Sequence, residues 1–339
     1  MTQDIWLKSK KYDIPFIILP GYLALILAIL LRDYYQITWV SLLLWVLMST
    51  MIDSAHVFVS LFRTYFSKKA QRLLKMVLLV TPVLAFTACY SLIQYDQSTY
   101  MKFLIYMVAF HYIRQHYGII IYYFNKTRSS KSSRRINQLA IYSTLIVPLI
   151  YWHTVPREFG WYGKIGFYFW DNPHFFNIAH YFLILVIAVY LFNELILFLK
   201  NKEINLPKNF LFIGLGFSWY YSIVKTDDAL TFLLVNNLAH GIPYFAFSWY
   251  FYQAEKENQQ AHINGKVLLF LAIPVLIAFI TQITTDLIFE HKYIEPTLGI
   301  KPWIVSGELQ GMIAAILGTF AITHYVLDAF IWRRKYIKN

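Results

Sequence analysis

The feature that most constrains this chain is a succession of apolar stretches, each long enough to cross a lipid bilayer. One crossing needs about 20 mostly apolar residues, and backbone groups in lipid must hydrogen-bond within their own segment, which favours helices. The sequence therefore predicts an all-α, polytopic transmembrane helical bundle of about ten spans. The predicted spans are Ile14–Leu31, Ile37–Phe62, Leu73–Tyr95, Tyr100–Phe124, Ile136–Val155, Phe175–Leu199, Phe210–Val224, Ala229–Tyr252, Val267–Phe289 and Gly307–Trp332.

The amino-acid composition agrees with a protein that is surrounded by lipid. The 339 residues are 58% hydrophobic and 14% charged, whereas soluble domains are about 45–50% apolar and about 25% charged. The apolar stretches are evenly spread, which predicts a single integral membrane domain over residues 1–339. Compact loops and the lack of a recognisable targeting segment favour a prokaryotic inner membrane.

The basic residues alternate from loop to loop. Of the 30 Lys and Arg residues, 22 lie at the two termini and in every second loop, 7 lie in the other loops, and Arg114 lies inside a span. The positive-inside rule then places both termini in the cytoplasm. A net charge of +12 that is divided among short clusters between apolar runs is typical of a membrane protein, so we expect no nucleic-acid partner.

Ionisable side chains gather in four of the predicted spans. Such residues are costly in a membrane and are functional candidates by default. At 1.5 Å per residue, all lie within about 20 Å of the predicted cytoplasmic ends of their spans. We therefore expect them to converge on one pocket in the cytoplasmic half of the bilayer. They are Asp53 and His56, then His111, Arg114 and His116, then His240, and finally His324 and Asp328.

Local spacing refines this site. Asp53 lies three residues before His56, and Asp328 four after His324, so each pair shares a helix face. Each carboxylate is expected either to ligate a metal or to orient the imidazole. His111 and His116 are five apart, so they reach one ion only if the helix is distorted or the site holds two ions.

Other polar residues receive weaker assignments. Arg114 is expected to pair with Asp53 or to hold an anionic headgroup. Glu194 is interpreted as a solvated residue at the end of its span, in preference to a further member of the site. A shallower group near the opposite surface is either a second metal site or a set of ordinary interfacial histidines. It comprises His153, His174 and His180.

Nitrogen and carboxylate ligands without a cysteine pair suit iron, zinc, copper or manganese. Several neutral imidazoles with an open coordination position suit iron and dioxygen, and the apolar surroundings suit a hydrophobic, lipid-like substrate. The leading hypothesis is therefore a metal-dependent, iron-containing membrane oxidoreductase, with a redox partner where the reaction needs outside electrons. The ligands would be His56, His111, His116, His240 and His324, with Asp53, Arg114 and Asp328 as catalytic groups and both aspartates also among the candidate metal ligands.

Two short motifs resemble histidine-ligated membrane iron enzymes. His111-x4-His116 resembles the first histidine box of membrane fatty acid desaturases and hydroxylases, although their His-x-x-His-His boxes are absent here. His324-x3-Asp328 is similar to an element of the bacterial carotene-cleaving dioxygenases of the Brp/Blh type, at a different position in the chain. The resemblance implies a multi-span oxygenase or desaturase that uses iron.

Three further functions fit the same residues. A membrane zinc hydrolase, similar to alkaline ceramidases and progestin-receptor-like proteins, would use Asp53, His56 and His324 to cleave a lipid amide or ester. Those proteins have a His-x3-His element near their C-terminal end, whereas this chain has Asp328 at the position of the second histidine. A proton- or metal-coupled transporter would place the same side chains along its transport pathway. Two facing histidines could also ligate a haem.

Overall fold

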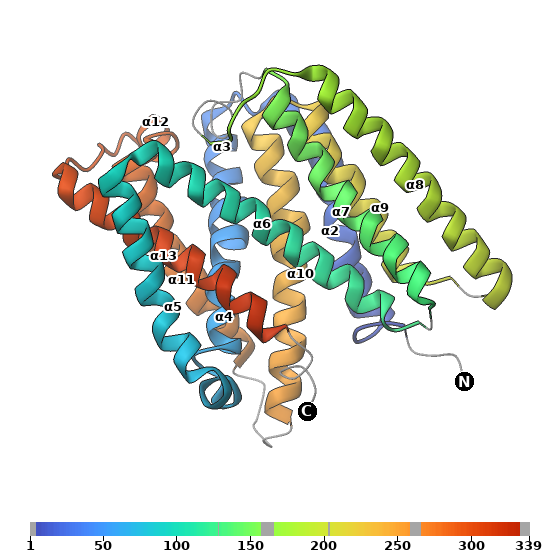
Figure 1. The fold of residues 1–339 in the computed structure, drawn as a ribbon. Helices are drawn as coiled ribbons and strands as arrows, with labels where there is room; N and C mark the ends of the chain where they lie inside the picture. Colours follow the sequence, from blue (N-terminus) through green and yellow to red (C-terminus); the bar gives the residue numbers. More distant parts are fainter. Residues whose placement is uncertain (1–4, 128, 157–165, 203, 258–265, 333–339) are drawn as a thin grey trace. The chain divides into compact units, whose positions relative to one another are not determined.

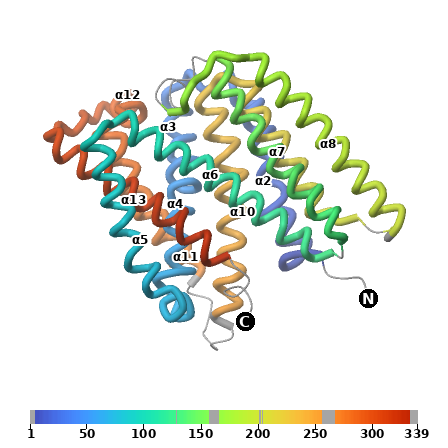
Figure 2. The backbone as a smooth tube through the Cα atoms, in the orientation of Figure 1, coloured from blue at the N-terminus to red at the C-terminus, as the bar shows by residue number. Residues whose placement is uncertain are grey.

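The computed structural model describes residues 5–127, 129–156, 166–202, 204–257 and 266–332, and all regular structure in these residues is helical (Figures 1 and 2). The prediction of an all-α fold is confirmed. The elements are α1 (Lys10–Asp13), η1 (Ile14–Ile18), α2 (Leu19–Leu31), η2 (Arg32–Tyr34), α3 (Thr38–Leu44), η3 (Trp45–Ser54), α4 (Ala55–Arg63), α5 (Lys68–Tyr95), α6 (Gln97–Phe124), α7 (Lys131–Thr154), α8 (Pro173–Asn201), α9 (Leu206–Tyr220), η4 (Tyr221–Lys225), α10 (Ala229–Glu257), α11 (Lys266–Thr285), η5 (Asp286–Glu290), α12 (Ile294–Leu298) and α13 (Gly307–Ile331).

Every predicted span coincides with a helix or with an unbroken run of helical elements. Seven helices in the described part are long and apolar enough to cross a membrane. They are Lys10–Tyr34, Thr38–Arg63, Lys68–Tyr95, Pro173–Lys200, Ala229–Glu255, Val267–Glu290 and Gly307–Ile331. The other three predicted spans correspond to α6, α7 and α9 with η4. The basic residues of the C-terminal tail lie outside the described residues, as do Arg128, Arg157, Lys164 and His262.

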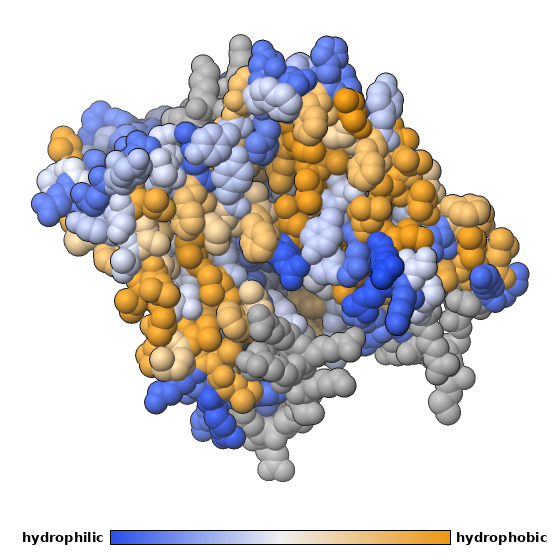
Figure 3. All heavy atoms as spheres, in the orientation of Figure 1, coloured by the Kyte–Doolittle hydropathy of each residue, from blue (hydrophilic) through white to orange (hydrophobic). Residues whose placement is uncertain are grey.

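Large apolar side chains remain exposed along several of these helices, as expected of surfaces that meet lipid. On α5, Met76 is 68% and Val83 64% exposed, and on α8, Ile178 is 67% and Phe192 64% exposed. The visible face shows hydrophobic residues along the middle of α5 and α8 and hydrophilic residues at their ends (Figure 3). This distribution supports a lipid bilayer as the environment of the protein.

The chain divides into two compact units. Unit 1 comprises Met1–Ile29 and Ala109–His240, and unit 2 comprises Leu30–Val108 and Gly241–Asn339. The boundaries fall within α2, α6 and α10 and not in linkers. The organisation as one integral membrane domain stays a prediction.

In unit 1, α7 packs against α8 and α9, and α9 packs against η1. The indole Nε1 of Trp219 on α9 donates to the carbonyl of Leu145 on α7 at 2.9 Å. The segment before α1 is held by the buried carboxylate of Asp13, which accepts from the amide of Leu7 at 2.5 Å and from the hydroxyl of Tyr123 at 2.8 Å. The sequence pattern predicts no role for Asp13, and in the structure its carboxylate anchors the segment before α1.

In unit 2, α13 packs along α5, while α11 packs against α4 and η3. A small residue allows α13 to lie close to its neighbours: a Cβ on Gly318 would lie 2.6 Å from the Tyr100 hydroxyl and 3.1 Å from Sγ of Cys89. The same hydroxyl donates to the carbonyl of Ala314 at 2.7 Å. Small residues at such contacts are how helices approach closely in membranes.

The predicted second span is not a uniform α-helix. Its central part, η3, is a π-helix that ends at Ser54, directly before α4. π-Helical segments are rare and often mark functional sites. Asp53 lies in η3 and His56 in the first turn of α4, so the irregular backbone positions two of the predicted site residues.

Candidate metal-binding histidines

The structure groups the predicted histidines into two clusters, each inside one unit. In unit 2, the rings of His56 on α4 and His324 on α13 meet edge to face, with centroids 5.0 Å apart. Both are buried, at 3% and 1% exposure. Two buried imidazoles from separate helices at this distance form a recognisable pair of nitrogen donors.

The π-helical turn determines which nitrogen of His56 is available. The Nδ1 atom of His56 contacts the carbonyl oxygen of Asp53. Because a carbonyl oxygen only accepts hydrogen bonds, Nδ1 carries the proton and Nε2 keeps its lone pair. The Asp53 carboxylate lies on the same side, with Oδ1 3.6 Å from Nδ1. Asp53 therefore fits the role of an orienting partner.

Asp328 stands in a similar relation to His324. Its Oδ1 lies 3.8 Å from His324 Nδ1, one turn away on α13, and accepts a 2.7 Å hydrogen bond from the hydroxyl of Tyr244 on α10. The Tyr244 ring meets both His56 and His324 edge to face, at 5.3 Å in each case. This tyrosine was not predicted from the sequence because its position is apolar in pattern, and it completes the cluster of unit 2.

In unit 1, three imidazoles meet around His240 on α10. The ring centroid of His240 lies 5.1 Å from that of His111 and 5.4 Å from that of His116, both on α6. All three are buried, at 0%, 3% and 6% exposure respectively. Residues five apart point about 140° away from each other, so His240 is approached by one of them on each side. Both imidazoles therefore contact the His240 ring, while the expectation that they share one ion only through a distorted helix or a two-ion site stays a prediction.

Polar and aromatic neighbours hold His240 in place. Tyr112 stacks on its ring at 3.9 Å with an interplanar angle of 9°, and the Tyr112 hydroxyl donates to Asn237 Oδ1 at 3.3 Å. The Gln115 side chain donates to the backbone carbonyl of His240 at 2.8 Å. The ring is therefore positioned by residues of both α6 and α10, as preorganised ligands require.

Arg114 lies apart from this cluster. It is exposed, donates to the hydroxyl of Tyr142 at 2.7 Å, and lies over the ring of Tyr117 at 5.5 Å. It lies three positions after His111, and its long side chain reaches α7. Its expected roles, a pair with Asp53 or a contact with an anionic headgroup, stay predictions.

The shallower histidines do not assemble. His153 Nδ1 donates to the carbonyl of Leu149 at 2.7 Å, His180 contacts the Tyr220 hydroxyl at 3.2 Å, and His174 is exposed at the start of α8. Of the two interpretations offered for them, these separate contacts favour ordinary interfacial histidines.

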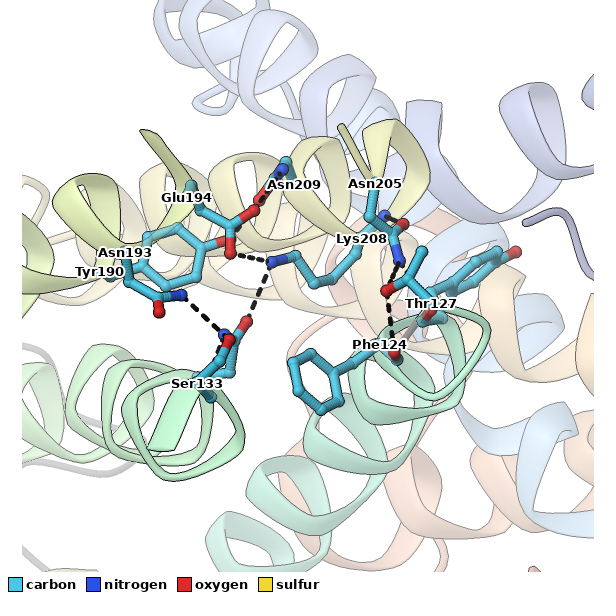
Figure 4. A network of polar contacts seen from close by, with 11 residues as sticks. Phe124, Thr127, Ser133, Tyr190, Asn193, Glu194, Asn205, Lys208 and Asn209 are labelled. Carbon is cyan, nitrogen blue, oxygen red and sulfur yellow. Dashed lines mark hydrogen bonds and ion pairs between the residues drawn. The ribbon is translucent and has the colours of Figure 1, made fainter. Parts of the chain in front are cut away.

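A further polar network in unit 1 was not predicted from the sequence (Figure 4). Lys208, interpreted as a loop charge, is 2% exposed, and its ammonium group pairs with Glu194 and donates to Asn137 Oδ1 at 3.0 Å. Asn209 donates to the other oxygen of Glu194 at 2.9 Å. The interpretation of Glu194 as a solvated end residue is wrong, because its side chain is 16% exposed and holds this pair.

Convergence of all five imidazoles on one pocket stays a prediction, whereas the grouping within each unit is a structural fact. In unit 2, two buried imidazoles with adjacent carboxylates match the requirements of a transition-metal site. In unit 1, three buried imidazoles match them. Comparison of the chain with models of protein families, with curated proteins and with solved structures finds no match.

Proposed function

We propose that this protein is a metal-dependent membrane oxidoreductase that acts on a hydrophobic, lipid-like substrate. The observation that carries the proposal is the meeting of three buried imidazoles, His111, His116 and His240, in unit 1. Three neutral imidazoles suit iron and dioxygen when the metal keeps an open coordination position, and zinc is the alternative metal. In unit 2, His56 and His324 offer a second pair of donors.

The residues around the histidines supply the rest of the chemistry. The Asp53 and Asp328 carboxylates lie 3.6 and 3.8 Å from Nδ1 of His56 and His324. Within hydrogen-bond distance they would orient the two imidazoles for a metal and raise their basicity. Bound iron would supply the activation of dioxygen. Hydroxylation of a C–H bond consumes one O₂, two electrons and two protons and releases water, so it needs a redox partner. Cleavage of a C=C bond that takes up both oxygen atoms needs no outside electrons.

We further propose ten spans with both termini in the cytoplasm of a prokaryotic inner membrane. The alternation of basic loops supports this topology, and α6, α7 and α9 with η4 supply three helices beyond the seven strongest. An even number of spans is required for both termini to lie on one side. Accessibility labelling of single cysteines, introduced at Lys11 and at Lys131 in a Cys89→Ser background, tests it: both should react from the cytoplasmic side alone.

Metal analysis of the detergent-purified protein tests the function. About one to two equivalents of iron support the oxidoreductase. Zinc in place of iron would favour the hydrolase, in which zinc lowers the pKa of a bound water. Metal-free protein, isolated without chelators and unable to bind added Fe(II), would contradict the proposal.

A further inference from the structure

A cleft in unit 2, separate from the histidines, holds a buried cation. It lies where α4 ends, where α5 begins, and near the ends of α10 and α13. Arg63 and Lys69 are its basic groups, Glu255 is its acidic group and is bonded to Ser67, and Ala70, Leu74 and Ile331 form its apolar wall. Arg63 follows directly on a predicted span, at a position where a solvated loop charge is expected, yet it is 7% exposed.

The guanidinium of Arg63 lies over the rings of Phe251 and Trp332, at 5.3 and 5.5 Å. Among the described residues it makes no ion pair within 4 Å, and its buried Nε has no hydrogen-bond partner. Glu255 and Asp328 act on it electrostatically from a longer range, and one oxygen of Glu255 is occupied by the Ser67 hydroxyl at 2.7 Å. A buried guanidinium that no anion contacts directly is costly, so an added anion would be stabilised here.

The start of α5 places a second basic side chain at the cleft. Ser67 is the N-cap of the first turn of α5, and its hydroxyl accepts from the amide of Ala70 at 3.1 Å. The backbone departs from helical geometry at Leu74, so only a short helical segment follows Ser67 before this kink. Lys69 lies in the same turn and lines the same cleft. Arg63 and Lys69 outnumber the one glutamate, so the residues that line the cleft carry net positive charge.

We propose that this cleft binds the phosphate group of an anionic membrane phospholipid. The phosphate accepts from Arg63 and Lys69, and it restores charge balance in a cleft whose lining residues carry net positive charge. A lipid is favoured over free phosphate because the wall is apolar and because Leu73 and Met76, at 51% and 68% exposure, continue along α5 toward the expected hydrocarbon region. Exposed Lys68 and Lys75 near the start of α5 would attract an anionic leaflet.

The experiment uses the delipidated full-length protein in a neutral detergent, with thermal unfolding as the readout. Short-chain phosphatidylglycerol should raise the wild-type Tm by about 5 °C through binding to the folded state. Phosphatidylcholine of the same chain length should raise it far less. Arg63→Gln and Lys69→Gln should each lose most of the phosphatidylglycerol shift, and Arg63→Lys should keep part of it.

The matched control is Arg72→Gln, which removes the same charge from an exposed position on the same helix and should keep the full shift. Lys69→Gln leaves the buried core intact, so the test stands even if Arg63→Gln does not fold. An equal shift with phosphatidylcholine would overturn the proposal. A full phosphatidylglycerol shift in Lys69→Gln would overturn it as well, whether or not Arg63→Gln folds. An equal shift with sodium phosphate at matched ionic strength would overturn the lipid as the source.

Discussion

The hydroxyl of Tyr244 donates a 2.7 Å hydrogen bond to Oδ1 of Asp328, the same oxygen that lies 3.8 Å from His324 Nδ1. One carboxylate oxygen thus connects an aromatic residue of α10 with an imidazole of α13. This relationship ties the orientation of a candidate metal ligand to the packing of two helices, and it leads to the first prediction.

Tyr244→Phe should destabilise the protein by about 1 kcal/mol, the usual net value of one hydrogen bond. It keeps the ring that packs against His56 and His324 while it removes the donor to Asp328. Metal content should fall as well, because Asp328 loses a constraint on its position. Reversible SDS unfolding in bicelles and elemental analysis measure the two effects. Tyr95→Phe, at an 82% exposed position of α5, is the control and should change neither quantity.

Replacement of individual histidines should distinguish those that bind the metal from those that do not. His240→Ala, His116→Ala, His56→Ala and His324→Ala should each lower the metal bound per protein, because each removes a buried imidazole from a cluster. The exposed His174 lies in neither cluster, so His174→Ala should retain the wild-type amount. The measurement is elemental analysis after size-exclusion chromatography. Unchanged metal in all four variants would remove both clusters as sites.

Gly241→Ala should destabilise unit 2. A Cβ at this position would lie 2.5 Å from Cγ2 of Ile52 and 3.2 Å from its carbonyl oxygen, in the π-helical segment. Overpacking of this kind costs about 1–3 kcal/mol. Thermal unfolding should show the loss, and Ile52→Ala in the same chain should restore part of it by removing Cγ2. Gly118→Ala is the control: nothing lies within 4 Å of its Cβ, so that variant should be as stable as the wild type.

The buried pair of Lys208 and Glu194 can be tested by a double-mutant cycle. Lys208→Met leaves the Glu194 carboxylate without its cation and should cost about 3–5 kcal/mol, the range for breaking a buried ion pair. Adding Glu194→Gln should recover a substantial part, since the neutral pair no longer leaves a charge uncompensated. Additive losses, measured by the same unfolding assay, would show that the two residues are not coupled. Lys200→Met, at an exposed position of α8, should have little effect.

The turn before α6 carries a pH-dependent contact. Hydrogen bonds from the Thr99 hydroxyl and amide, both at 2.7 Å, hold the pKa of Asp96 below its ordinary value of 3.8. A folded-state pKa below the unfolded one means that the contact stabilises fully above pH 3.8 and is lost as the pH falls through the lowered value. Carboxyl-carbon NMR titration in micelles should show this, and Thr99→Val should bring the pKa back toward 3.8.

Helix positions and the identity of the histidines were predictable from the sequence, because apolar stretches of bilayer length specify helices on their own. His56, His116, His240 and His324 stood out since imidazoles are rare within such stretches. The pairing of Asp53 and Asp328 with their neighbouring histidines followed from helical spacing, and both pairs are present.

Other contacts could not be predicted, because they depend on which helices pack together. Tyr244 and Tyr112 look like ordinary aromatic residues in an apolar span until their rings are seen against the imidazoles. Lys208 looks like a loop charge until α8 and α9 bring Glu194 beside it. Sequence alone determined the membrane helices and the polar residues within them, since hydrophobicity and helical period are local properties. Tertiary structure alone decided how those residues group, because a side chain reaches residues on other helices only after the backbones have packed.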